Sequence, residues 1–244
     1  MALGTNNPSP QRTDTMSHTE THVTDIDVGL RAYMLKVYNY MSIGLGLTGA
    51  VAYATSTSPT VMQAIYGTPL QWVVMLAPLG LVFFFAARIH AMKASTALAL
   101  FWVYSGLTGL SLAYIFMAYT GESVTRVFFI TAGAFAGLSL FGYSTKRDLS
   151  GMGTFLIMGV IGIVIASLVN IFLASSALQF AISVIGVLIF AGLTAYDTQQ
   201  IKSMYHERDA GDEHEKKAIM GALKLYLDFL NMFIFLLHIF GNRR

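Results

Sequence analysis

The sequence predicts an all-α, polytopic membrane protein. Apolar residues fill 55% of its 244 positions and charged residues only 11%, whereas a soluble domain carries about 25% charged residues. Charge is absent from four long stretches, residues 37–87, 94–121, 127–145 and 149–196. A helix crosses the hydrocarbon core of a bilayer with roughly 20 apolar residues, so two of these stretches hold helix pairs. This composition excludes an ordinary soluble enzyme and a disordered chain.

Turn residues place the breaks between the predicted helices. Residues 55–59, 67–69 and 174–176 are rich in Ser, Thr, Gly and Pro or close a long apolar run, as expected for loops. The six helices that result cover about 38–54, 70–87, 96–118, 127–143, 153–173 and 178–196.

A last apolar segment, about 225–240, contains Asp228, Asn231 and His238. Only a helix that its neighbours enclose holds such groups comfortably within a membrane. We therefore expect a seventh span. The terminal pair Arg243 and Arg244 leaves open the alternative of a segment that re-enters without crossing.

The distribution of Lys and Arg predicts a cytoplasmic N-terminus. In that orientation most of the 15 Lys and Arg residues lie on cytoplasmic segments, whereas Arg126, Arg243 and Arg244 lie outside. Residues 1–35 are polar and show no cleavable signal peptide, so we expect a disordered cytoplasmic tail followed by a transmembrane domain over residues 36–244.

Absent chemistry narrows the possible functions. The sequence has no cysteine, which excludes disulfide scaffolds, thiolate metal sites and cysteine nucleophiles. The net charge of +2 favours contact with anionic lipid over nucleic acid in a membrane protein. We expect the lipid bilayer as a partner, no nucleic acid and no bound cofactor.

Two aspartates at one membrane depth are the strongest functional candidates. Asp197 ends the sixth helix and Asp228 lies near the start of the last segment, and the loop between them is cytoplasmic in the predicted orientation. Close carboxyl groups cannot both ionise cheaply, so such a pair shares a proton. Its oxygens also suit a hard cation such as Ca²⁺. The alternative is that each carboxylate simply reaches water at a helix end.

Four other polar residues could support the pair. Arg88 ends the second helix at the same face, either as a counter-ion or as a membrane anchor. Asn170 and Asn231 are candidates for hydrogen bonds between helices. Tyr226 is either a hydrogen-bond partner of the carboxylates or an interface aromatic.

Small residues indicate close contacts between helices. Gly133 and Gly137 form a GxxxG pattern, and Gly44, Gly46 and Gly49 cluster in the first helix. Such patterns allow helix backbones to approach closely, and we interpret them as packing features without chemistry.

Four motifs in order resemble the Bax inhibitor family, in particular its bacterial inner-membrane branch. The resemblance covers about residues 28–242. The motifs are Arg31-Ala-Tyr-Met-Leu-Lys-Val-Tyr38, Phe141-Gly-Tyr-Ser-Thr-Lys-Arg-Asp-Leu-Ser150, Tyr196-Asp-Thr-Gln-Gln-Ile-Lys202 and Ala222-Leu-Lys-Leu-Tyr-Leu-Asp-Phe-Leu-Asn231.

The resemblance implies a fold of seven helices, six of which surround the last. It implies a pH-sensitive Ca²⁺ leak in which paired aspartates, matching Asp197 and Asp228, sense pH, and in which an arginine matching Arg88 bonds one of them. Some relatives also carry an acidic residue in the second helix, where residues 75–79 are apolar here. A second position for coordinating the cation is therefore not expected.

Three functions compete at this point. The first is a Ca²⁺-permeable leak channel that closes when the aspartate pair shares a proton. The second is an intramembrane aspartyl protease, which Leu225-Tyr-Leu227 before Asp228 disfavours because that class uses Gly-x-Gly-Asp there. The third is a protein without transport of its own that binds a membrane-bound protease or acts in a stress response, as the resemblance allows. We expect the first, and no enzyme activity.

Overall fold

The computed structural model describes residues 14–207, 209 and 211–244, with side chains from residue 28 onward. The regular secondary structure in this part of the chain is helical, apart from an isolated β-bridge between Tyr119 and Arg243. The helices are α1 (Asp14–Ser56), α2 (Pro59–Tyr66), α3 (Leu70–Arg88), η1 (Ile89–Ala91), α4 (Ala94–Leu112), α5 (Ile115–Ala118), α6 (Gly121–Ser144), α7 (Ser150–Leu173), α8 (Ser176–Ser203) and α9 (Gly211–Phe240).

Among the described residues, six helices are long and apolar enough to cross a membrane. They are formed by α3 with η1, α4 with α5, α6, α7, α8 and α9, so the chain is an integral membrane protein. The remaining predicted span, residues 38–54, lies within α1. That stretch includes Tyr38, Asn39 and Tyr40 and is not among the six. The all-α class is confirmed, and the count of seven spans stays a prediction.

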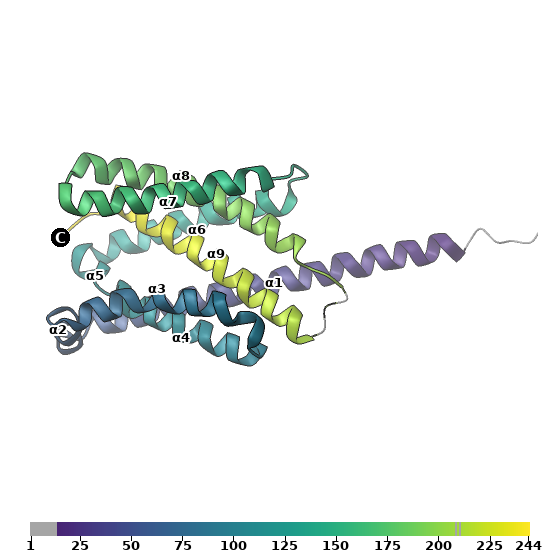
Figure 1. Cartoon of the computed structure of the whole chain (residues 1–244), viewed down its shortest axis with the longest axis horizontal. Helices are drawn as coiled ribbons and strands as arrows, with labels where there is room; N and C mark the ends of the chain where they lie inside the picture. The colour runs from purple at the N-terminus through teal and green to yellow at the C-terminus, as the bar shows by residue number, and fades with distance from the viewer. Residues whose placement is uncertain (1–13, 208, 210) are drawn as a thin grey trace, which may run out of the picture.

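The helices form two groups joined by α9. In one group α4 packs against α1 and α3, and in the other α8 packs against α6 and α7. Figure 1 shows α9 running obliquely between the groups, and it contacts α1, α4, α6 and α8. Because α3 packs on α4 and α7 on α8, these two helices form the outer edges of the assembly.

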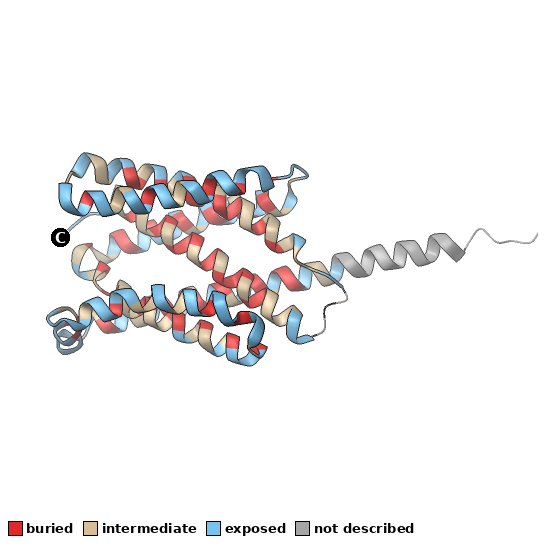
Figure 2. Cartoon of the chain, viewed as in Figure 1, coloured by how far each residue is buried: buried red, intermediate tan, exposed pale blue. Residues whose placement is uncertain are grey.

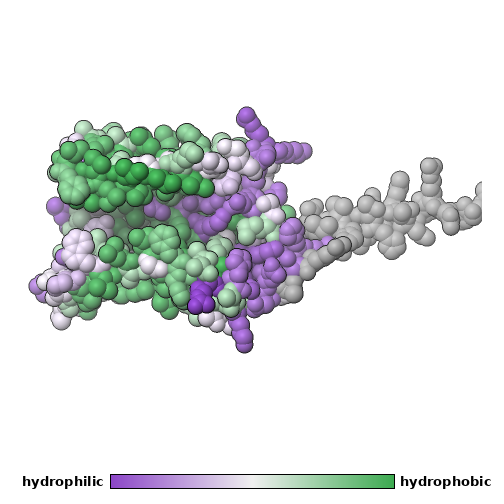
Figure 3. Space-filling model, in the orientation of Figure 1, coloured by the Kyte–Doolittle hydropathy of each residue, from purple (hydrophilic) through white to green (hydrophobic). Residues whose placement is uncertain are grey.

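The outer faces are apolar and the contacts of α9 are buried. In the most apolar window of α3 and of α7 only 11% of the residues are buried, against 56% for α9. Figure 2 shows the buried residues following α9 along its length. Figure 3 shows a broad apolar surface with hydrophilic side chains at the end where α1 extends, here called the polar end. Apolar outer faces of this kind suit contact with lipid tails.

The two ends of α9 lie at opposite ends of the bundle. It starts close to the end of α8, and its C-terminal extension meets the start of α6, where Asn242 N donates to Ser123 Oγ (2.9 Å). Thr120 N also donates to the carbonyl oxygen of Asn242 (3.1 Å). This geometry favours the crossing segment over the re-entrant alternative.

Helix α1 starts before the expected boundary at residue 36. Residues 1–13 of the predicted tail lie outside the described residues, but α1 is helical from Asp14, and Tyr33 and Met34 are buried. Together with Leu30 and Val37 they follow the i, i+3, i+4, i+7 spacing of one helix face, and that face packs into the core. This buried face therefore begins before residue 36, and the division of the chain into a tail and a transmembrane domain stays a prediction.

The short helix α2 (Pro59–Tyr66) lies between the loops expected at residues 55–59 and 67–69, where we predicted no helix. Ser58 caps it by accepting from Val61 N (3.5 Å), and Pro59 opens its first turn. A serine cap followed by proline is a helix-start signal. Our interpretation of residues 55–59 as a turn did not include it.

The glycines divide into packed and open positions. A Cβ on Gly142 of α6 would lie 2.2 Å from the carbonyl oxygen of Ala195, so α6 and α8 approach closely there. At Gly133, Gly137, Gly46 and Gly49 a Cβ would meet nothing within 4 Å. The predicted packing role of the GxxxG pattern is therefore wrong for contacts within the described chain.

Candidate functional site

The structure brings the two predicted aspartates together. Asp197 lies on α8 and Asp228 on α9, two helices that pack closely against each other, and the two carboxyl groups are near enough to interact electrostatically. Asp228 is only 4% exposed, and its Oδ2 atom has no hydrogen-bond partner among the described residues. A buried carboxyl oxygen without a partner is costly, so this position is not explained by packing.

Lys224 is the cation beside the pair. Its Nζ atom lies 3.7 Å from Asp197 Oδ1 and also donates to Gln200 Oε1. The side chains of Lys224 and Asp197 are 35% and 13% exposed. Exposure therefore falls from Lys224 through Asp197 to the buried Asp228, and the three residues lead inward from the polar end.

Arg88 lies away from this pair. It is exposed at the end of α3, which packs on α4, and within the described part of the chain it makes no ion pair with either aspartate. The sequence placed Arg88 at the correct end of the bundle. In this structure the cation beside the pair is Lys224, and the counter-ion role that the family resemblance implies for Arg88 stays a prediction.

Tyr226 and Asn231 do not reach the carboxylates. The Tyr226 hydroxyl lies 2.6 Å from Thr48 Oγ1 on α1, and its ring contacts those of Phe101 and Tyr104 on α4. Asn231 Nδ2 donates to the Leu227 carbonyl of its own helix (2.8 Å). Tyr226 therefore ties α9 to α1, and the interhelical bond expected for Asn231 is absent from the described contacts.

Asn170 makes the predicted contact between helices at the other end of the bundle. Its Nδ2 atom donates to Gln179 Oε1 (3.2 Å), which joins α7 to α8. Its Oδ1 atom accepts from Ser175 N (3.0 Å) in the connecting turn. Asn170 therefore stabilises a helix junction and has no part in the aspartate site.

A set of polar contacts holds the first turns of α9. Glu215 accepts from Lys36 Nζ (2.7 Å) and from the Tyr40 hydroxyl, both on α1, and Asp212 Oδ1 accepts from Ala94 N at the start of α4 (3.0 Å). Each contact crosses from α9 to the group of α1 and α4. A displacement of α9 from α8 would therefore act on these contacts as well.

The sequence contained a signal for Lys224 and Gln200 that we did not use. Lys224 precedes Asp228 by four residues and Gln200 follows Asp197 by three, so each lies on the same helix face as its aspartate. We had interpreted Lys224 only as one of several cytoplasmic charges.

The arrangement suits transient contact with a hard cation better than permanent binding. Asp197, Asp228 and Gln200 provide side-chain oxygens on adjacent helices, but Ca²⁺ takes six to eight oxygen ligands. Among the described residues no group of three or more His, Asp or Glu is arranged to hold a metal. Any cation at this site would keep several waters.

Comparison with known proteins assigns the chain. The family model described as "Inhibitor of apoptosis-promoting Bax1" matches residues 30–244. The chain belongs to the Bax inhibitor family. The match includes both aspartates, Lys224 and Arg88, so the whole candidate site lies within the family domain.

Three relatives of this Bax inhibitor family protein come from bacteria. An uncharacterised protein of Rickettsia prowazekii is 49% identical over 95% of this chain and 98% of its own length. The inner membrane protein YbhL of Escherichia coli is 48% identical over 88% of this chain and 94% of its own. An uncharacterised membrane protein of Streptococcus pyogenes is 38% identical over 90% and 96%. Family and membrane location are thus established together.

Proposed function

We propose that this Bax inhibitor family protein is a pH-sensitive, Ca²⁺-permeable leak channel gated by a latch between α8 and α9. The observation that carries the proposal is the pairing of Asp228, buried and with an unpartnered oxygen, with Asp197 on the adjacent helix. Two interacting carboxyl groups on adjacent helices share a proton at the lowest cost, so the contact between the helices would depend on pH.

The latch is closed while the proton is shared. We place the proton on Asp228, because Asp197 has the Lys224 ammonium beside it and is the carboxyl better suited to ionisation. Loss of the proton leaves two negative charges on adjacent helices, which repel. α9 then moves from α8 and exposes oxygens that replace part of the hydration shell of Ca²⁺.

The orientation that fits this latch has the N-terminus in the cytoplasm of a bacterium with the protein in its inner membrane. The polar end, which carries Lys36, Lys146, Arg147 and Lys224, then faces the cytoplasm, as the excess of positive charge favours. Asp197 would then respond to cytoplasmic pH, because water reaches it beside the partly exposed Lys224 side chain.

The test is Ca²⁺ uptake into proteoliposomes at pH 6, 7 and 8 by the wild type, Asp197→Asn and Asp228→Asn. Wild-type flux should rise on the alkaline side of its transition, and either substitution should remove the pH dependence because an asparagine cannot share and release the proton. Asn231→Leu is the matched control on α9, since Asn231 bonds only its own helix in the described contacts. Equal flux at all three pH values in the wild type would refute the latch.

Proteolysis and partner binding are less well supported. α9 is helical without a break from Gly211 to Phe240, so the backbone at Asp228 is not opened toward an extended peptide. The alternative of a protein that modulates a membrane protease or a stress response, without transport, rests on the family resemblance alone. A wild-type protein that passes no Ca²⁺ at any pH would put this alternative first.

A further inference from the structure

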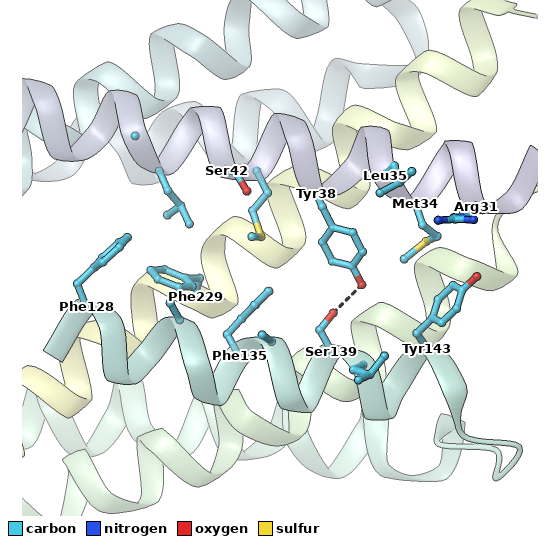
Figure 4. A pocket seen from close by; sticks show the side chains of 16 residues that line it. Arg31, Met34, Leu35, Tyr38, Ser42, Phe128, Phe135, Ser139, Tyr143 and Phe229 are labelled. Carbon is cyan, nitrogen blue, oxygen red and sulfur yellow. Dashed lines mark hydrogen bonds between the residues drawn. The ribbon is translucent and has the colours of Figure 1, made fainter. Parts of the chain in front are cut away.

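A long groove lies between α1 and α6. Its cavity at the polar end measures about 840 Å³ and has Phe229 of α9 among its lining residues. The small residues Gly46, Ala132 and Ala136 leave it hollow, and a Cβ on Gly46 would meet nothing within 4 Å. Figure 4 shows side chains from α1 and α6 facing each other across this space.

The groove continues toward the other end of the bundle. A second cavity of about 670 Å³ shares Leu45, Phe128 and Phe229 with the first. From Arg31 to Gly46 the first cavity follows α1 for about 22 Å at 1.5 Å per residue, whereas one leaflet of the hydrocarbon core is about 15 Å thick. The first cavity therefore reaches through the depth of one leaflet.

The groove opens to the surroundings of the membrane-spanning helices. Leu35 on one rim is 53% exposed and Leu140 on the other is 66% exposed, and both line the cavity. Lipid tails are what surrounds such a rim within the bilayer.

The end of the groove carries positive charge. Arg31 is exposed and lines the cavity at the polar end, where Figure 4 shows it beside Tyr143. Lys202 Nζ donates to the Tyr143 carbonyl (2.9 Å) and lies 4.8 Å from the centre of that ring. The described lining of the two cavities includes no acidic residue. The positive charge at the polar end of the groove is therefore complementary to an anionic group.

The hydroxyl groups of Tyr38 and Ser139 inside the groove already have partners. The Tyr38 hydroxyl lies 2.7 Å from Ser139 Oγ, which in turn lies 2.9 Å from Thr198 Oγ1 on α8. An extended peptide would need partners for its own N–H and C=O groups in this apolar space, and these hydroxyls are engaged. A hydrocarbon chain needs none.

We propose that the α1–α6 groove binds an anionic phospholipid, with one acyl chain along the cavity between α1 and α6 and its phosphate on Arg31. The occupant belongs to the leaflet at the polar end. The proposal is independent of Ca²⁺ conduction, since it concerns a different face of α9 from the one that carries Asp228.

The test is native mass spectrometry of the full chain with equal amounts of phosphatidylglycerol and phosphatidylcholine of identical acyl chains. The wild type should retain one phosphatidylglycerol in preference to phosphatidylcholine by about tenfold, the size of one charge-assisted contact. Both lipids carry a phosphate, but the choline cation of phosphatidylcholine offsets its attraction to Arg31. Arg31→Gln should remove the preference, and Arg31→Lys should restore most of it. Gly46→Leu, which fills the groove, should lower retention of both lipids.

Gly133→Leu is the matched control, because Gly133 is exposed on α6, has open space around it and does not line the groove. Its lipid retention should equal that of the wild type, and its melting temperature shows whether an added leucine is tolerated in the bundle. Equal retention of the two lipids by the wild type would overturn the proposal, as would unchanged retention in Gly46→Leu.

Two other occupants give distinct results. If deletion of residues 1–13 increases lipid retention several-fold, the N-terminal segment fills the groove in the full chain and the proposal is wrong. If Gly46→Leu converts a dimer into a monomer without changing lipid retention, the groove is an interface between two copies.

Discussion

Replacing Lys224 should move the pH dependence of Ca²⁺ flux, whereas replacing Arg88 should not. Lys224 Nζ lies 3.7 Å from Asp197 Oδ1, and at an effective dielectric constant of 20 two unit charges at this separation attract by about 4 kcal/mol. Because Lys224 is 35% and Asp197 13% exposed, solvent screening reduces the net contribution to about 1–2 kcal/mol. One pH unit corresponds to about 1.4 kcal/mol, so Lys224→Gln should shift the flux transition by about one unit.

The shift should be toward alkaline pH. Removal of the ammonium group makes it harder to hold two negative carboxylates side by side, so the shared proton is retained to higher pH and the latch stays closed. The assay is Ca²⁺ uptake into proteoliposomes in half-unit steps from pH 5.5 to 8.5. Lys224→Arg keeps the charge and should keep the transition, and Arg88→Gln should leave it in place because Arg88 is exposed at the end of α3. A transition that moves in Arg88→Gln and not in Lys224→Gln would show that Arg88 is the counter-ion of the proposed latch.

Three further predictions concern packing, the α8–α9 loop and topology. Gly142→Ala should lower the stability in detergent by about 1–3 kcal/mol, because its Cβ would lie 2.2 Å from the Ala195 carbonyl oxygen. Gly133→Ala, with open space around it, should be neutral. Equal melting temperatures of the two variants would contradict the close approach of α6 and α8. The hydrogen bond from Lys217 lowers the pKa of Asp209, so this contact stabilises the loop at neutral pH, and its stabilisation is lost only as pH falls below about 4. Asp209→Asn should therefore speed proteolysis of the loop at pH 7. No change in cleavage rate would count against the contact. The sequence has no cysteine, so Asn242→Cys and Ser203→Cys each allow single-site labelling. An impermeant maleimide should reach the two positions from opposite sides of the membrane. Labelling of both from the same side would show that α9 does not cross.

The sequence predicted most of the fold because the absence of charge is a direct consequence of burial in lipid. The predicted segments 70–87, 127–143 and 153–173 lie within α3, α6 and α7. The helices extend further than predicted at the polar end, where α8 reaches Ser203 and α9 begins at Gly211. Charged residues no longer mark helix ends there, because this part of the helices can project from the membrane into water.

The same reasoning found the aspartate pair and missed its counter-ion. Asp197 and Asp228 belong to sequential helices joined by a short connection, and such helices are usually neighbours. Equal depth was therefore enough to bring them together. The i, i+4 spacing of Lys224 and Asp228 indicates that both lie on one face of the helix. However, a lysine near a membrane surface is often an anchor, so the sequence alone did not single out Lys224.

Depth in the membrane and position around the bundle are separate pieces of information. Charge along the chain gives the depth of each residue, and it placed Arg88, Asp197 and Asp228 at one level. Which helices are neighbours depends on how side chains interlock, and α3 packs on α4, outside the contact between α8 and α9. A counter-ion must satisfy both conditions. In this structure Lys224 satisfies both because it is carried by α9 itself, one turn from Asp228, and so it would follow the aspartate if α9 moved. A latch built this way keeps its cation with the moving helix and leaves Asp197 behind on α8, so that opening separates the Lys224–Asp197 ion pair as well as the two carboxyl groups.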